Sequence, residues 1–286
     1  MSLYKISVII ATKDRKDFLL SLIKDLLNQD FGFENFEVCV VDNSSIKVDF
    51  INKELVNLNY KYFHKPSFEG PCKMRNFAAE IACGKYLLFL DDDISIKENV
   101  LKMYWETINR YNCDWVVGAL CKTDWSYNNL NYSVFIKNAF SDISLMKLIA
   151  LPSCPGLFPT FGFGAGCSLI SSKLFKEIGM FDESFDPTAA GEDRNLAMRL
   201  LGNNCWGIHN GDIRILHFGV PTGGSRPNGS RVYSLRIHWL LTLKVFVDKS
   251  RYLLIKIVFL YDLINTMIKR GPTKDRIRQF YNLVKI

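Results

Sequence analysis

Short apolar runs alternate with stretches of helical periodicity over the first 120 residues of the chain. Runs with the length and composition of buried strands lie at 6–11, 36–41, 60–64, 86–90 and 115–119, and a later one lies at 213–216. Apolar spacing and start and stop residues predict helices at 17–27, 71–82, 98–111, 172–178 and 192–201. Strands that alternate with helices predict the α/β class, with a mostly parallel central sheet flanked by helices.

The longest stretch without a charged residue is 148–172. It is long enough to span a bilayer, but it contains three prolines and four glycines, which interrupt any continuous helix. We therefore interpret it as a loop around a cavity.

Positive charge is concentrated towards residue 286. The chain has 36 Lys and Arg against 29 Asp and Glu, a formal charge of +7. Residues 231–286 contain 12 of the basic and 3 of the acidic side chains, so the preceding part is nearly neutral. We predict a first domain at 1–225 and a basic, apolar, helical extension at 226–286, whose charge favours an anionic partner.

Three interpretations of this extension remain open. Basic helices that contain Trp and Tyr suit an anionic membrane surface, but they also suit an interface in a homo-oligomer or a helical cap on the first domain. No interval free of charge in this region is long enough to span a bilayer. No nucleic-acid-binding module is recognisable, so nucleic acid is not an expected partner.

The eight cysteines are scattered without a C-x-x-C pair, and the first residues lack the pattern of a signal peptide. These features predict reduced thiols and a cytoplasmic location, with peripheral contact to the inner face of the membrane as an option.

Polar residues follow three of the predicted strands, at 12–14, 42–45 and 91–93. Ligands of open parallel sheets bind at this edge. The triplet at 91–93 is the most informative, because three adjacent aspartates repel one another unless a cation or hydrogen bonds compensate them. Mg²⁺ or Mn²⁺ binds such carboxylates together with phosphate oxygens, whereas capping of the next turn is the structural alternative.

Glycine-rich phosphate loops are absent from the sequence. There is no G-x-G-x-x-G after the first strand and no G-x-x-x-x-G-K-[ST]. We therefore expect any bound phosphate to depend on a metal ion.

Other candidate residues have both a structural and a chemical interpretation. Glu192 and Asp193 begin a predicted helix, where carboxylates either complement the helix dipole or serve as an acid–base pair. His217 follows the last predicted strand, and Arg75 lies near the start of a helix.

These segments together resemble the family 2 glycosyltransferases of the GT-A fold. The resemblance rests on the strand and loop at 6–15, on 40–45, on 70–93 with its aspartate triplet, and on 191–200. It covers about residues 4–220, and its motifs occur in the family's order. The residues at 71–74 depart from the small residues that are usual in the family.

The resemblance implies a role for each candidate. The implied nucleotide-binding residues are Ala11, Thr12, Asp42, Arg75, Asp91 and Asp92. The implied ligands of Mn²⁺ or Mg²⁺ are Asp92, Asp93 and His217. Asp193 would be the general base, with Glu192 beside it at the acceptor. The glycine-rich run 161–166 would lie beside the donor sugar, unless it is a packed, twisted strand.

The function that the resemblance implies is metal-dependent, inverting transfer of a sugar from a nucleotide-diphosphate sugar. UDP is the preferred nucleotide, the acceptor is a glycan or lipid-linked hydroxyl, and the setting is surface polysaccharide synthesis. A sugar-phosphate nucleotidyltransferase is the nearest alternative, but the loop at 12–15 has no glycine. A non-catalytic glycan- or lipid-binding protein is the second alternative, which the retained acidic motifs disfavour.

Overall fold

A computed structural model gives the structure of the chain and describes residues 2–48, 58–128, 153–187, 189, 191–220, 260, 264, 267 and 268. The chain divides into two compact units, Met1–Ser141 with Leu145–Arg226 and Asp142–Ser144 with Pro227–Ile286. Apart from four helical residues, the predicted extension at 226–286 lies outside the described residues. In the part that the structure describes, no helix combines the length and apolar character needed to cross a membrane.

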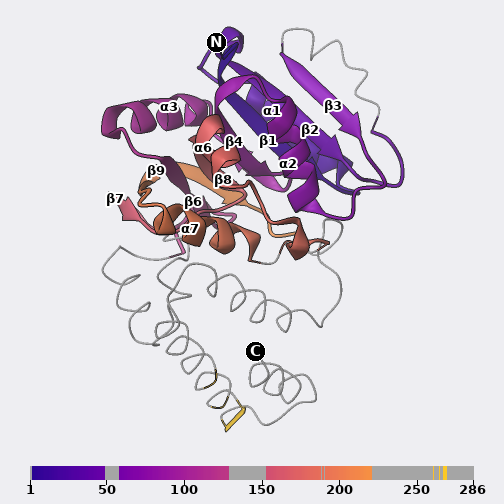
Figure 1. The fold of residues 1–286 in the computed structure, drawn as a ribbon. Coiled ribbons are helices and arrows are strands. Elements are labelled where there is room, and N and C mark those ends of the chain that lie inside the picture. The colour runs from indigo at the N-terminus through magenta and orange to yellow at the C-terminus, as the bar shows by residue number, and fades with distance from the viewer. Residues whose placement is uncertain are drawn as a thin grey trace. The chain divides into compact units, whose positions relative to one another are not determined.

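A mixed sheet forms the centre of the first unit (Figure 1). Its nine strands within the described residues are β1 (Tyr4–Thr12), β2 (Phe36–Asp42), β3 (Tyr60–His64), β4 (Gly84–Asp91), β5 (Ile94–Ile96), β6 (Trp115–Cys121), β7 (Leu157–Thr160), β8 (Cys167–Ser171) and β9 (Gly207–His217). The strand order is β3-β2-β1-β4-β8-β6-β9-β5, with β7 beside β9. β1 to β4 are mutually parallel, and β8 runs antiparallel to β4 and β6.

The helices lie close to their predicted positions. Among the described residues of the first unit they are α1 (Lys16–Leu27), α2 (Pro71–Ile81), α3 (Val100–Tyr111), α6 (Ser172–Glu177) and α7 (Glu192–Gly202), with 3₁₀ turns η1 (Phe33–Asn35) and η3 (Glu183–Phe185). α2 packs on β1 and β2, α3 on β6 and β9, and α6 on β4 and β8. The α/β class predicted from the alternation of strands and helices is confirmed.

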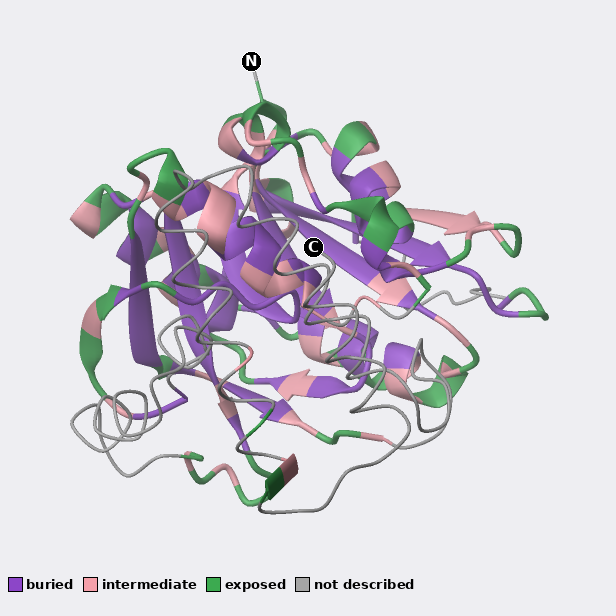
Figure 2. Cartoon of the chain, turned by 60° about the horizontal axis from the view of Figure 1, so that its bottom comes forward, coloured by how far each residue is buried: buried purple, intermediate pink, exposed green. Residues whose placement is uncertain are grey.

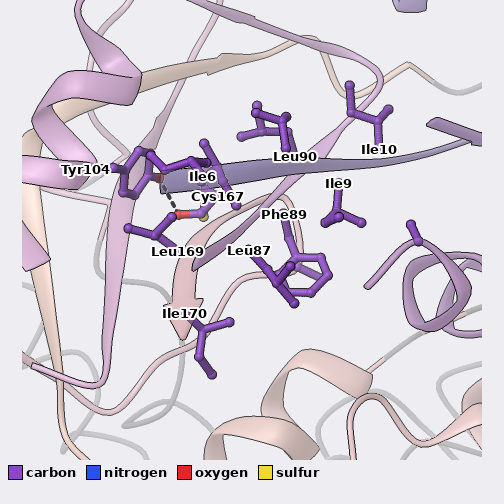
Figure 3. Packing of buried hydrophobic residues seen from close by; sticks show 14 of the residues in the cluster. Ile6, Ile9, Ile10, Leu87, Phe89, Leu90, Tyr104, Cys167, Leu169 and Ile170 are labelled. Atoms are coloured by element: carbon purple, nitrogen blue, oxygen red, sulfur yellow. Dashed lines mark hydrogen bonds between the residues drawn. The ribbon is translucent and has the colours of Figure 1, made fainter. Parts of the chain in front are cut away.

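Both faces of the central strands are covered (Figure 2). Ile9 and Ile10 of β1 are fully buried although they point to opposite faces, and Phe89 of β4 is fully buried as well. Figure 3 shows these side chains packed together with residues of β8. The Tyr104 hydroxyl of α3 donates a hydrogen bond of 2.6 Å to the Cys167 carbonyl, so the helix is tied to the inserted strand β8.

The interpretation of 148–172 as a loop is corrected over its described part, which begins at residue 153. This part contains β7 and β8, and β8 is inserted between β4 and β6. Glycine, cysteine and serine around β8 concealed the strand, because they do not give the branched apolar pattern of a buried strand. β9 begins at Gly207 instead of 213, since polar residues interrupt its apolar pattern where the register with β6 shifts.

Candidate active site at the carboxyl edge of the sheet

The ends of β1, β2 and β4 lie level at one edge of the sheet. Ala11 pairs with Val41 on one side and with Asp91 on the other, and Thr12 pairs with Asp42. Strand register therefore aligns four of the predicted nucleotide-binding residues. The polar residues at the strand ends pointed to this edge of the sheet, and the family resemblance implied the role of these four residues, Ala11 among them.

Asp91 at the end of β4, Asp93 in the turn between β4 and β5, and His217 at the end of β9 form a compact group. β9 pairs with β5 so that His217 lies opposite Ile94, the residue after Asp93. One ligand atom from each of the three lies within 4.8 Å of the others, and His217 Nε2 is 3.3 Å from Asp93 Oδ1. Burial raises the pKa of Asp93, but His217 and Arg15 outweigh this effect and hold the pKa below its usual value. Two carboxylates and an imidazole at this spacing fit a divalent metal ion.

Asp92, which the resemblance assigns to the metal, has other partners. Thr12 Oγ1 donates to Asp92 Oδ2 at 2.7 Å, and Arg15 Nη1 donates to Asp92 Oδ1 at 2.9 Å. Asp92 is buried, which raises its pKa to about 6. Asp92 and Asp93 lie in the bend that follows β4, beyond the last residue of the strand. The structure thus groups Asp91 with Asp93 and His217, and places Asp92 against Thr12 and Arg15.

Arg15 was not among the predicted site residues. Its Nη1 atom also lies 3.1 Å from Asp93 Oδ2, so its charge offsets the repulsion within the aspartate triplet. Its Nη2 atom donates to the Val220 carbonyl at 2.9 Å, and Val220 N donates to Asp93 Oδ2 at 3.1 Å. The first loop and the segment after His217 therefore meet at Asp93.

Arg75 connects the carboxyl edge of the sheet to α7. Its Nη2 atom donates to Asp91 Oδ1 at 2.9 Å and its Nη1 atom to Glu192 Oε1 at 3.1 Å. The guanidinium is nearly buried and lies 5.7 Å from the centre of the Phe181 ring. Its Nε atom is buried and has no hydrogen-bond partner among the residues that the structure describes. Two carboxylates contact this one guanidinium, so its single positive charge offsets only part of their negative charge when both are ionised.

Glu192 and Asp193 lie at the start of α7 in different surroundings. Glu192 is buried, bonded to Arg75, and accepts a hydrogen bond of 3.1 Å from Gly191 N. Burial and the neighbouring Asp193 raise the pKa of Glu192 to about 8. Asp193 is more exposed than Glu192 and accepts a hydrogen bond of 2.7 Å from Arg194 N. Burial also raises the pKa of Asp193.

Asp42 closes a turn at the end of β2. Its Oδ1 atom accepts from Ser44 N at 2.8 Å and its Oδ2 atom accepts from the Tyr62 hydroxyl at 2.6 Å. Asp42 is fully buried, so its carboxylate acts on the protein's own backbone and on Tyr62. Tyr62, a partner that the sequence did not identify, lies on the neighbouring strand β3.

The glycine-rich run 161–166 is neither a strand nor a helix, and it connects β7 to β8. A Cβ atom on Gly166 would lie 2.3 Å from Asp91 Oδ2. The backbone therefore approaches a predicted site residue closely, and a larger residue at position 166 would displace the Asp91 carboxylate.

Comparison with known proteins gives the family. Residues 7–179 match the family described as "Glycosyl transferase family 2". The O-antigen biosynthesis protein RfbC of Myxococcus xanthus is 25% identical over 233 residues, which are 74% of this chain and 17% of RfbC. The poly(ribitol-phosphate) beta-N-acetylglucosaminyltransferase TarS of Staphylococcus aureus is 34% identical over 113 residues, 38% of this chain and 20% of TarS. The chain thus spans no more than about a fifth of these relatives.

A solved structure gives the same fold. The crystal structure of S. aureus TarS 1–349 in complex with UDP-GlcNAc matches with a TM-score of 0.70 and 18% identity, over 98% of this chain and 79% of that one. The predicted GT-A architecture is confirmed by this match. The family match covers the strand ends, the aspartate triplet and Arg75, and it stops before α7 and His217. The chain belongs to glycosyl transferase family 2.

Proposed function

We propose that the chain is a metal-dependent, inverting glycosyltransferase that moves a sugar from a nucleotide-diphosphate sugar to an acceptor hydroxyl. The observation that carries the proposal is the pair of bonds made by Arg75. They connect Asp91, a member of the Asp91–Asp93–His217 group, to Glu192 beside Asp193. Arg75 thus connects the Asp91–Asp93–His217 group, which suits a metal ion and a diphosphate, to the start of α7, where Asp193 suits the proton of a hydroxyl.

The nucleotide lies along the aligned strand ends in this proposal. Ala11, Thr12 and Arg75 bind it directly, together with Asp91 at the ribose. Asp42 acts through the turn that it closes, because both of its oxygens are engaged with Ser44 and Tyr62. UDP is the nucleotide we favour, and the structures of the relative TarS with UDP-GlcNAc and with UDP support that choice.

Asp91, Asp93 and His217 would hold a Mn²⁺ or Mg²⁺ ion. Such an ion, when bound, neutralises the charge that develops on the leaving diphosphate. Asp92 stays with Thr12 and Arg15, and so fixes the carboxylates on either side of it in the chain.

Asp193 is the general base in this mechanism. Glu192 is engaged by Arg75, whereas the Asp193 carboxylate is the more exposed of the two. Asp193 takes the proton of the acceptor hydroxyl while the hydroxyl oxygen bonds to the anomeric carbon of the donor. The bond from that carbon to the diphosphate oxygen breaks, and the nucleoside diphosphate leaves with the electron pair. Attack opposite the leaving group inverts the anomeric configuration, and a raised pKa favours proton transfer near neutrality.

The acceptor class is a glycan or lipid-linked hydroxyl in surface polysaccharide synthesis. This assignment is supported by the names of the relatives, which include an O-antigen biosynthesis protein and a poly(ribitol-phosphate) beta-N-acetylglucosaminyltransferase.

A thermal-shift series with UDP-, GDP- and dTDP-sugars and Mn²⁺ tests the donor. UDP-sugars are expected to raise the melting temperature most, because a ligand stabilises the state that binds it. The absence of a shift with every nucleotide sugar would contradict the proposed site.

The substitution Asp193→Asn tests the base. We expect transfer to fall by about 10²- to 10⁴-fold while donor binding is retained, because only the proton acceptor is removed. Asp212→Asn, an exposed carboxylate of β9, is the matched control and should keep full transfer. Wild-type transfer by Asp193→Asn with normal donor binding would show that another group takes the proton.

A further inference from the structure

The first turn of α2 is capped by a residue from a distant part of the chain. Gly70, at the N-cap, has no side chain that could accept a hydrogen bond. Asp186 supplies the acceptors instead: its Oδ1 atom accepts from Cys72 N and its Oδ2 atom from Lys73 N, both at 3.0 Å. Two of the N–H groups that a helix start leaves unpaired are thus satisfied by one carboxylate.

Gly70 leaves room for that carboxylate. A Cβ atom at position 70 would lie 2.3 Å from Asp186 Oδ1. The backbone of Gly70 is extended, with φ of −170°, so conformation alone would allow another residue. The glycine is required by space, because the Asp186 carboxylate occupies the position where a side chain would begin.

The same two segments are joined at further points nearby. Asn76 Nδ2 donates to the Phe181 carbonyl at 2.9 Å, and Phe181 N donates to Asn76 Oδ1 at 3.0 Å. Arg75 Nη1 donates to Glu192 Oε1 at 3.1 Å. Contacts on both sides of Arg75 therefore bind the start of α2 to the segment that leads into α7.

We propose that Asp186 is a positioning residue, which fixes the start of α2 so that Arg75 reaches Asp91 and Glu192 together. The inference rests on the proposed function, which assigns Arg75 to the nucleotide and Glu192 to the acceptor side. A Ser or Thr at position 70 could cap the helix locally. Capping from residue 186 does more, because it also fixes the segment before α7 against the helix that carries Arg75.

Three single substitutions test this role. Asp186→Ala removes both acceptors, Asp186→Asn retains one acceptor oxygen, and Gly70→Ala leaves the carboxylate in the chain but takes its space. Asp182→Asn is the matched control, since Asp182 is an exposed carboxylate of the same segment that accepts from Ser184 N at 2.9 Å and caps η3 instead of α2. Each protein is assayed for UDP binding with Mn²⁺ by calorimetry, for kcat and donor KM, and for melting temperature.

Displacement of Arg75 is expected to weaken UDP binding and raise donor KM by about tenfold or more in Asp186→Ala and Gly70→Ala, with kcat lowered by up to about a hundredfold. Asp186→Asn should lie between these variants and the wild type. The control Asp182→Asn should match the wild type in UDP affinity, donor KM and kcat. Loss of a cap alone would lower the melting temperature by a few degrees and leave UDP binding and donor KM unchanged. That result, with unchanged kcat, would overturn the inference.

A measurement without ligand separates this inference from the proposed function. Asp186→Ala and Glu192→Gln are combined in a double-mutant cycle followed by thermal unfolding. We expect Glu192→Gln to lower the free energy of unfolding less in the Asp186→Ala protein than in the wild type, because the two contacts support one arrangement. Additive effects would count against the positioning role. A wild-type protein that shows this coupling but binds no nucleotide would contradict the proposed function and leave the structural link intact.

Discussion

Each of two arginines at the site is shared between two carboxylates. Arg15 contacts both Asp92 and Asp93, and Arg75 contacts Asp91 and Glu192. Each of these arginines is nearly buried, so removal of one would leave carboxylates without compensation in a poorly solvated place. The effect of the arginine is weakest at Glu192, because burial and the neighbouring Asp193 raise the pKa of this carboxyl to about 8 although Arg75 lowers it.

The raised pKa of Glu192 predicts a pH-dependent stability. Between its ordinary value of 4.5 and about 8, the folded protein retains a proton that the unfolded chain releases. The contribution is complete below about pH 4.5 and is lost as the pH rises through about 8, by at most about 1.4 kcal/mol per pH unit. Glu192→Gln should therefore flatten the fall in melting temperature from pH 5 to pH 8, measured by calorimetry in EDTA without donor.

The exposed substitution Glu80→Gln is the control for this experiment, and its curve should run parallel to that of the wild type. A Glu192→Gln curve that also runs parallel to the wild type would show that Glu192 ionises as it does in water.

At the scale of elements, strand ends were predictable and their side-chain partners were not. The polar residues after β1, β2 and β4 could be located because each follows an apolar run, and parallel pairing places them level. The position of β8 was concealed, because its pairing comes from β4 and β6 and not from its own pattern. Asp186 carried no local signal either, since its partners lie 113 and 114 residues earlier in the chain.

The Asp91–Asp93–His217 group, which we propose holds the metal ion, depends on the pairing of β9 with β5, because this pairing brings His217 to the aspartates. We expect His217→Ala to weaken Mn²⁺ binding by about tenfold or more, as followed by electron paramagnetic resonance of the free ion. His64→Ala is the control, because His64 ends β3 and lies outside the Asp91–Asp93–His217 group. Equal Mn²⁺ affinity in all three proteins would place the metal elsewhere, and full transfer in excess EDTA would remove it from the mechanism.

At the scale of the whole molecule, the excess of positive charge and the candidate active-site residues lie in different parts of the sequence. The candidate active site lies entirely within residues 11–220, whereas the positive excess belongs to residues 231–286. The overall charge of +7 therefore gives no information on the donor. It bears on where the protein docks, and we propose an anionic membrane surface.

Vesicle flotation tests that docking. The full chain should float with vesicles of phosphatidylcholine and phosphatidylglycerol at low salt, and less at high salt. The triple substitution Lys249→Glu, Arg251→Glu and Lys256→Glu should lower the bound fraction by more than about tenfold, since each basic residue near such a surface contributes about 1 kcal/mol. Pure phosphatidylcholine vesicles are the control. No flotation of the wild-type chain would favour the subunit interface or the helical cap. Equal flotation of both proteins would show that these three basic residues do not bind the membrane.

The contacts among Arg15, Asp93 and Val220 have a consequence for the synthesis of the protein on the ribosome. Residues 15 and 220 are joined by a hydrogen bond although 205 positions separate them. Domains begin to fold from the N-terminus while the ribosome is still extending the chain. The parallel strands with their aspartates can therefore emerge first, but His217 and Val220 arrive much later. A nascent chain that stops before these residues would carry the strand ends without His217 of the Asp91–Asp93–His217 group, so in the proposed mechanism competence for chemistry is a late event in synthesis.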